Sequence, residues 1–159
     1  KIMSKMNEIF FSSTFGGEAL SLVASIETIN KIQRTDAISK MKKTGMQLVS
    51  GLNNIIDQSI LKGMFLFLGP DWWPRLNIVN VDINITLFKS LLRQELNAAG
   101  LIINATLNLS LSHTQANIVE ETLMRFKLAI DKLSEHMQKK DPQKALKGDL
   151  MKPTFSVRT

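Results

Sequence analysis

The chain has 159 residues, 44% of them hydrophobic and 21% charged, which is the balance of a globular protein rather than of a disordered one. It contains no cysteine, which excludes disulfides, thiolate metal sites and cysteine nucleophiles and fits a reducing compartment, so we expect a cytoplasmic location. The net charge is +6, but six basic and two acidic residues after position 138 supply +4 of it, so we expect no nucleic-acid partner.

Hydroxyl side chains and two glycines gather before the first long apolar segment, in the run Ser12-Ser13-Thr14-Phe15-Gly16-Gly17-Glu18. Hydroxyl groups and the free N–H groups of a helix start are suitable donors to a phosphate. On local chemistry alone, we favour an ordinary helix start with capping hydroxyls, which any fold can contain. Residues 18–34 then predict a helix that is apolar on most sides, and we expect such a helix to be buried.

A second helix is predicted after the break at Thr35-Asp36, with Asp36 as its N-cap. Gly45 and Gly51 weaken helix propensity, so we expect each glycine to permit the close approach of another segment. One stripe of apolar residues and glycine recurs at spacings of three and four: Ile38, Met41, Gly45, Leu48, Leu52 and Ile55.

The pattern changes after residue 63. Apolar residues 64–68 and the alternating residues 76–82 predict two strands, joined by the aromatic turn 69–74. An amphipathic helix is predicted over 86–99, ended by Gly100. No apolar run is long enough to cross a bilayer, so we expect no membrane partner.

Short runs at 101–103 and 107–111 predict a third and a fourth strand. Thr114 is the expected N-cap of a last helix, with Val119, Leu123, Phe126, Ile130 and Leu133 on its apolar face. The residues after Gln138 show no period, and we expect a basic tail held by few contacts.

Few of the remaining polar residues indicate catalysis. His113 lies at a turn and His136 at a polar helix end, and neither has the partners of a serine–histidine–carboxylate set, so we expect His136 to be solvated. Arg75 follows two tryptophans, where it would clamp a substrate carboxylate or, more simply, stack on an indole ring. Two histidines without cysteine offer no metal-ligand spacing, so we expect no metal site.

The hydroxyl run, the turn Leu111-Ser112-His113-Thr114 and the ending Pro153-Thr154-Phe155-Ser156-Val157-Arg158 together carry a family resemblance. The chain resembles the C-terminal portion of class III pyridoxal-phosphate-dependent aminotransferases, near the glutamate-1-semialdehyde aminotransferase-like branch. The resemblance implies an α/β fold, the C-terminal part of a fold-type I PLP-dependent transferase, in which long interface helices precede a small α/β domain. Residues 1–62 would end the large domain, 63–138 would form the small domain, and 139–159 would be the basic tail.

The resemblance also implies a homodimer that binds pyridoxal 5′-phosphate and transfers an amino group from a small-molecule amino donor to a carbonyl acceptor, with glutamate-1-semialdehyde-like or sugar-linked substrates. Thr14 matches the threonine that reaches the cofactor phosphate across the dimer interface, and Ser13 is the second cofactor-binding position. The Schiff-base lysine would precede Lys1, so this segment holds no catalytic residue and is expected to be inactive alone. A non-catalytic dimerisation module that uses the apolar helices as its interface is the alternative, and basic nucleic-acid binding is a third.

Overall fold

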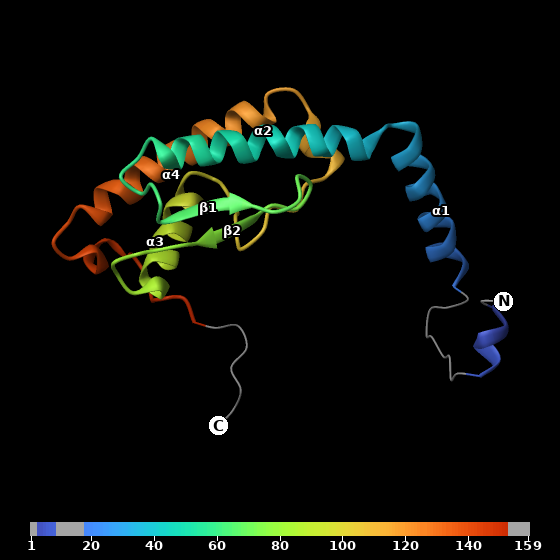
Figure 1. Ribbon diagram of the computed structural model, residues 1–159, viewed down its shortest axis with the longest axis horizontal. Helices are drawn as coiled ribbons and strands as arrows, with labels where there is room; N and C mark the ends of the chain where they lie inside the picture. The colour runs from blue at the N-terminus through green and yellow to red at the C-terminus, as the bar shows by residue number, and fades with distance from the viewer. Residues whose placement is uncertain (1–2, 9–17, 153–159) are drawn as a thin grey trace. The chain divides into compact units, whose positions relative to one another are not determined.

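The protein is described by a computed structural model, which covers residues 3–8 and 18–152 (Figure 1). The chain divides into two compact units, Lys1–Ile38 and Ser39–Thr159, which are described separately. Helices predominate among the described residues, with one two-stranded antiparallel sheet, so the fold is α/β in a broad sense. The fold-type I assignment and the functional division at residues 62 and 138 stay predictions.

The first unit contains a short 3-10 helix, η1 (Met3–Asn7), and the helix α1 (Ala19–Arg34). The predicted helix over 18–34 is therefore confirmed within one residue. The expectation that it is buried is wrong for this chain, because no residue of α1 is buried and Leu20 is 77% exposed. An apolar helix is buried only where a second surface covers it, and no described residue of its own unit covers α1.

The second long helix, α2 (Ala37–Asp57), follows a turn in which Asp36 adopts a left-handed conformation with φ 49°. In the described residues no hydrogen bond joins the Asp36 carboxylate to α2, so the predicted N-cap is not formed. Leu48 and Leu52 are buried as the apolar stripe predicts, but Ile38 is exposed. At the far end the fully buried residue is Ile56, one position beyond the predicted Ile55.

Both glycines of α2 permit the close approach that their positions predict. A β-carbon at residue 45 would clash with the backbone carbonyl of Asp71, which lies in the turn between the two strands. A β-carbon at residue 51 would lie 2.5 Å from the side chain of Leu123 on α4. The turn and α4 therefore pack directly against the backbone of α2.

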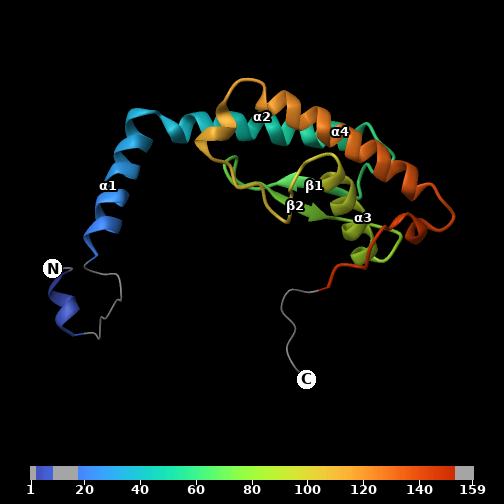
Figure 2. The same ribbon diagram turned by 180° about the vertical axis from the view of Figure 1, so that it is seen from behind.

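The sheet is a hairpin of β1 (Phe65–Leu68) and β2 (Arg75–Ile78), which pair with Phe65 opposite Ile78 and Leu68 opposite Arg75. Figure 1 and Figure 2 show α2 and α4 running along one side of this hairpin. Asn53 of α2 covers the outer edge of β1: its side-chain amide donates to the Phe67 carbonyl (2.9 Å), and its oxygen accepts from the Phe67 N–H (2.8 Å). Asn53 thus takes the place of a neighbouring strand at one residue.

The predicted third and fourth strands, 101–103 and 107–111, are not strands in the structure. The segment makes one isolated bridge, Thr106 with Arg75, and residues Leu111–Thr114 form a 3-10 helix, η2. Two backbone hydrogen bonds join this segment to the start of β2: the Leu76 N–H donates to the Ala105 carbonyl and the Leu107 N–H donates to the Pro74 carbonyl, each at 2.9 Å. In the described residues the pairing does not continue beyond them. Asparagine at 104 and 108 is unfavourable in strands, and this composition is consistent with the short pairing.

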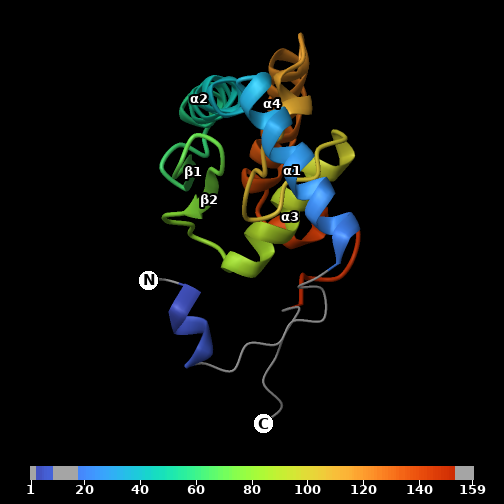
Figure 3. The same ribbon diagram turned by 90° about the vertical axis from the view of Figure 1, so that its right-hand side faces the viewer.

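The helices α3 (Ile85–Ala98) and α4 (Ile118–Met137) complete the second unit. Asn84 caps α3, which the sequence analysis did not predict, and the predicted end at Gly100 is confirmed, with φ 80°. The predicted cap of α4 is wrong, because Thr114 ends η2 and the left-handed residue Asn117 precedes α4 instead. Seen end-on, α2 and α4 lie side by side (Figure 3).

The core of the second unit lies where the hairpin meets the helices. The ring of Phe65 packs edge-on against Phe88 of α3, with ring centroids 5.6 Å apart. The ring of Phe67 packs in the same way against Phe126 of α4 at 5.9 Å. All four rings are buried, so the inner face of β1 ties α3 and α4 into one core.

Candidate functional site

Ser13 and Thr14, the predicted phosphate contacts, lie outside the described residues, and their roles stay predictions. The structure does describe Glu18, which ends the same run, and the start of α1 directly after it. The Glu18 carboxylate accepts hydrogen bonds from the N–H groups of Leu20 (2.8 Å) and Ser21 (2.7 Å). Hydrogen bonds from the hydroxyl and N–H of Ser21, and from the N–H of Leu20, lower the pKa of Glu18.

This cap changes one expectation about phosphate binding. The predicted site included the free N–H groups of the helix start, but Glu18 already occupies those of Leu20 and Ser21. The carboxylate also places a negative charge where an anion would otherwise meet the positive end of the helix dipole. A phosphate at this turn would therefore depend on the hydroxyl and N–H groups of residues 12–17.

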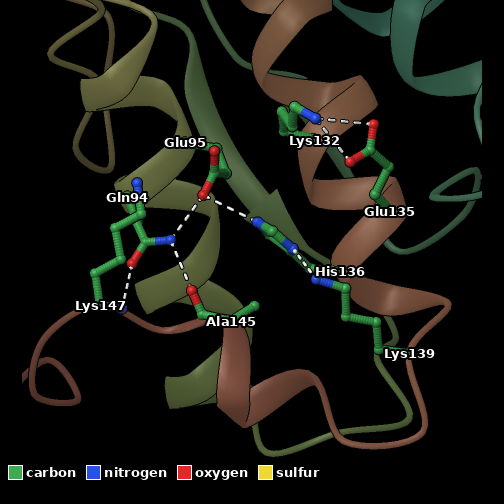
Figure 4. Close-up of polar contacts among 8 residues, drawn as sticks. All are labelled: Gln94, Glu95, Lys132, Glu135, His136, Lys139, Ala145 and Lys147. Atoms are coloured by element: carbon green, nitrogen blue, oxygen red, sulfur yellow. Dashed lines mark hydrogen bonds and ion pairs between the residues drawn. The ribbon is translucent and has the colours of Figure 1, made fainter.

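A second polar cluster joins α3 to α4 (Figure 4). The Nε2 atom of His136 lies 3.1 Å from Oε1 of Glu95, and these side chains are only 14% and 9% exposed. The expectation that His136 is solvated is therefore wrong. A sequence cannot reveal this pair directly, because the two residues are 41 positions apart and meet only when α3 packs on α4.

The partners of His136 favour one tautomer. Glu95 is a carboxylate and accepts, so Nε2 carries the proton, and Nδ1 accepts from the Lys139 ammonium group at 3.4 Å. Both ring nitrogens are thus engaged, and within the described residues no hydroxyl group hydrogen-bonds to either. This arrangement suits a structural contact and does not form a nucleophile with its base.

Gln94 extends the cluster to the chain after α4. Its amide donates to Oε1 of Glu95 (2.7 Å) and to the Ala145 carbonyl (3.1 Å), and its oxygen accepts from the Lys147 N–H (2.7 Å). Further along, the Met151 N–H donates to the Ser90 hydroxyl at 3.0 Å. Residues 145–151 are therefore held against α3, which corrects the expectation of a tail with few contacts.

An exposed ion pair flanks this cluster. Lys132 lies 2.8 Å from Glu135. The hydrogen bond and the charge of Glu135 raise the pKa of Lys132. The hydrogen bond from Lys132 lowers the pKa of Glu135. Because both side chains are exposed to water, this pair contributes little to folding.

The other sequence candidates have structural contacts. His113 lies in η2, where its Nδ1 accepts from the Ser110 N–H at 3.0 Å. Arg75 is exposed on β2, and the ring contacts of the described residues involve phenylalanine only, so the predicted stacking on tryptophan is not formed. In residues 3–8 and 18–152, no group of three or more histidine, aspartate or glutamate side chains could hold a metal ion.

An open groove of about 700 Å³ runs beside α3, between this helix, β2 and the segment 103–105. We call it the α3 groove. Its lining includes the buried apolar residues Leu92, Leu96 and Ile103, and Met151 from the segment after α4. Among the described residues, Lys89 and Arg93 are the only charged ones that line it. Sequence reasoning missed this site, because its walls come from four separate segments of the chain.

The described residues contain no helix long and apolar enough to cross a membrane. Comparisons with known proteins add no further assignment: the chain matches no protein-family model, no curated protein sequence and no solved structure.

Proposed function

We propose that this chain is part of a PLP-dependent aminotransferase of class III, a cytoplasmic homodimer, and supplies its cofactor-phosphate contact. The observation that carries the proposal is the run Ser12–Glu18, with hydroxyl groups and a glycine pair directly before a long apolar helix. The close-approach glycines of α2 and the later turn at Ser112-His113-Thr114 follow in the order that the family resemblance requires.

The chemistry of this run fits a phosphate group. Ser13 and Thr14 each offer a hydroxyl donor, and Gly16 and Gly17 leave the backbone N–H groups accessible because they carry no side chain. The Glu18 carboxylate is bound to the first turn of α1, and its negative charge opposes a phosphate there, so the hydroxyl groups would have to outweigh it. Thr14 and Ser13 would hold the cofactor by its phosphate.

Among the described residues, no lysine has a suitable environment for covalent attachment of the cofactor. A reactive lysine is desolvated in a pocket so that its pKa falls, whereas every lysine from Lys5 to Lys152 is exposed. The reactive lysine of the proposed enzyme would therefore lie outside the described residues. Pyridoxal phosphate, once bound, supplies an electron sink for moving an amino group from donor to carbonyl acceptor. This chain would bind and orient its phosphate.

A test of the proposal substitutes Thr14 by valine in the complete dimeric enzyme. Valine keeps the shape and removes the hydroxyl, so the cofactor affinity should fall by about ten- to a hundredfold without loss of fold. Cofactor absorbance in an equilibrium titration measures the affinity, and Thr28→Val on α1 is the matched control, since its hydroxyl bonds only to the Ala24 carbonyl. Unchanged affinity would mean that Thr14 is a helix-start residue only.

A mixed dimer tests whether Thr14 acts across the interface. One subunit carries Thr14→Val and its partner lacks the reactive lysine, so action across the interface leaves one intact site and about half of the wild-type activity. If Thr14 serves its own subunit, each site carries a defect and the activity falls much further. The 159-residue chain alone should give no stoichiometric borohydride-trapped lysine adduct with pyridoxal phosphate.

The alternative function is a non-catalytic dimerisation module, and the exposure of α1 favours it. Leu22, Val23, Ile26 and Ile29 are all more than half exposed, so this helix offers an apolar surface to a partner. A dimer without any cofactor absorbance, from the full protein, would support this function over transamination.

A further inference from the structure

We propose that the α3 groove binds a small amphipathic anion: an apolar body that carries a carboxylate or phosphate head group. The inference is independent of transamination, because it rests on residues 76–151 and not on the hydroxyl run. A groove of about 700 Å³ lies within the size range of small-molecule sites in proteins.

The charge of the groove indicates the head group. Lys89 and Arg93 are four residues apart on α3, so their like charges lie on one face and repel each other. Within the described residues, neither side chain has an ion pair or hydrogen bond, and no aspartate or glutamate of that part of the chain lines the groove. An oxyanion would relieve this repulsion, and the guanidinium group can bind it through two parallel hydrogen bonds.

The opposite wall adds polar groups. Past the bridge between Arg75 and Thr106, no backbone hydrogen bond joins residues 77–78 to residues 103–104 in the described part of the chain. The two segments separate there, and Asn77 and Asn104 line the opening. Their amide groups have no hydrogen-bond partner among the described residues, so they can donate to a bound anion.

The floor of the groove indicates the rest of the ligand. Leu92, Leu96 and Ile103 are buried beneath it, and the more exposed Ile85 lies at its rim. Met151 contributes an unbranched side chain that adapts its shape to a ligand. An apolar chain or ring that covers these side chains removes their surface from water and adds to the affinity.

The experiment uses the 159-residue chain with methyl-labelled methionine and four probes of one length: octanoate, octyl phosphate, octanol and octylammonium. The Met151 methyl signal, assigned with Met151→Leu, should shift saturably with octanoate or octyl phosphate, and the stronger of the two identifies the head group. The Met124 methyl on α4 is exposed outside the groove and should not move. Octylammonium should not bind, and octanol should bind more weakly than the anions.

Charge-removing variants test the two cations. Lys89→Gln together with Arg93→Gln should weaken anion binding at least tenfold and leave the octanol shift unchanged. Lys62→Gln is the matched control, because Lys62 is exposed in a turn outside the groove. Equal binding of octylammonium and octanoate, or an unchanged anion affinity in the double variant, would overturn the proposal.

A chain that ends at Lys152 tests the other possible occupant. We expect it to bind the anion with unchanged affinity. If the anion binds only after residues 153–159 are removed, that segment of the chain is the occupant of the groove, and the proposed ligand is wrong.

Discussion

Single side chains replace secondary structure at two points in this molecule. Asn53 pairs with both backbone groups of Phe67 on the open edge of β1, and Gln94 pairs with the backbone of residues 145 and 147. In each position the amide presents a donor and an acceptor side by side, as a neighbouring strand does. The hydrogen bonds of these backbone groups are satisfied in this way without an additional strand.

Asn53→Ala should lower the free energy of unfolding by about 1–3 kcal/mol, because it leaves the N–H and carbonyl groups of Phe67 without partners. Urea unfolding followed by circular dichroism measures the change. Asn54→Ala is the control, since Asn54 is exposed and bonds only to Gln58. Equal effects of the two substitutions would show that the β1 edge does not need Asn53.

Glu95→Ala should lower stability by about 1–3 kcal/mol, because two donors, from Gln94 and His136, lose a buried acceptor. The same change should speed hydrogen exchange at the Lys147 N–H, since Gln94 is then no longer oriented toward it. Glu135→Ala removes an exposed carboxylate on α4 and should alter neither measurement appreciably. Unchanged hydrogen exchange at the Lys147 N–H would show that the Glu95–His136 pair does not help to hold the segment after α4 in place.

At the scale of elements, the segment after α4 is anchored more firmly than its composition predicts. Ala145 and Leu146 pack against the core, and η3 (Pro142–Ala145) starts with a proline. The basic residues on either side of these two, Lys139, Lys140, Lys144 and Lys147, are exposed to water. A charge-rich segment with only two apolar anchors shows no period, and therefore its contacts are not visible in the sequence.

A chain that ends at Gln138 should be less stable than one that ends at Lys152 by more than about 2 kcal/mol, because it loses two apolar contacts and the three hydrogen bonds that hold residues 145–151 against α3. Thermal and urea unfolding of both chains give the difference. A difference below about 1 kcal/mol would restore the interpretation of a loosely held tail.

The helices were predictable where local signals agree. Gly100 marks the end of α3, and the apolar period of α4 gives its buried face. The third and fourth strands were not, because apolar runs of three to five residues predict a strand only if a neighbour is available to pair with them. The α3 groove and the Glu95–His136 pair depend on contacts between distant segments, which one sequence does not display.

At the scale of the whole molecule, the exposed helix α1 is the largest departure from a self-contained domain. Its apolar residues point in most directions around the helix, and none of them is buried in this chain. A monomeric protein rarely leaves such a surface in contact with water. Both proposed functions, the aminotransferase and the dimerisation module, cover it with a second subunit.

The 159-residue chain should therefore self-associate as its concentration rises, and sedimentation velocity should detect this. Replacing Leu22, Ile26 and Ile29 by glutamine removes one apolar stripe of α1 and should restore the monomer. Asn30→Gln with Gln33→Asn is the control, since it changes exposed polar positions on the same helix. A compact monomer of the unmodified chain at high concentration would argue against an interface at α1.

The contact between Gly45 and Asp71 gives the molecule a natural optical reporter. The chain has only two tryptophans, Trp72 and Trp73, and both stand in the turn whose backbone rests on Gly45. Each indole is about half exposed, at 53% and 47%, so its emission should respond to the solvation of that turn. Tryptophan fluorescence would then follow the detachment of this turn, while far-ultraviolet circular dichroism follows the unfolding of the helices. Coincidence of the two unfolding curves would show that the hairpin and the helices lose their structure as one cooperative unit.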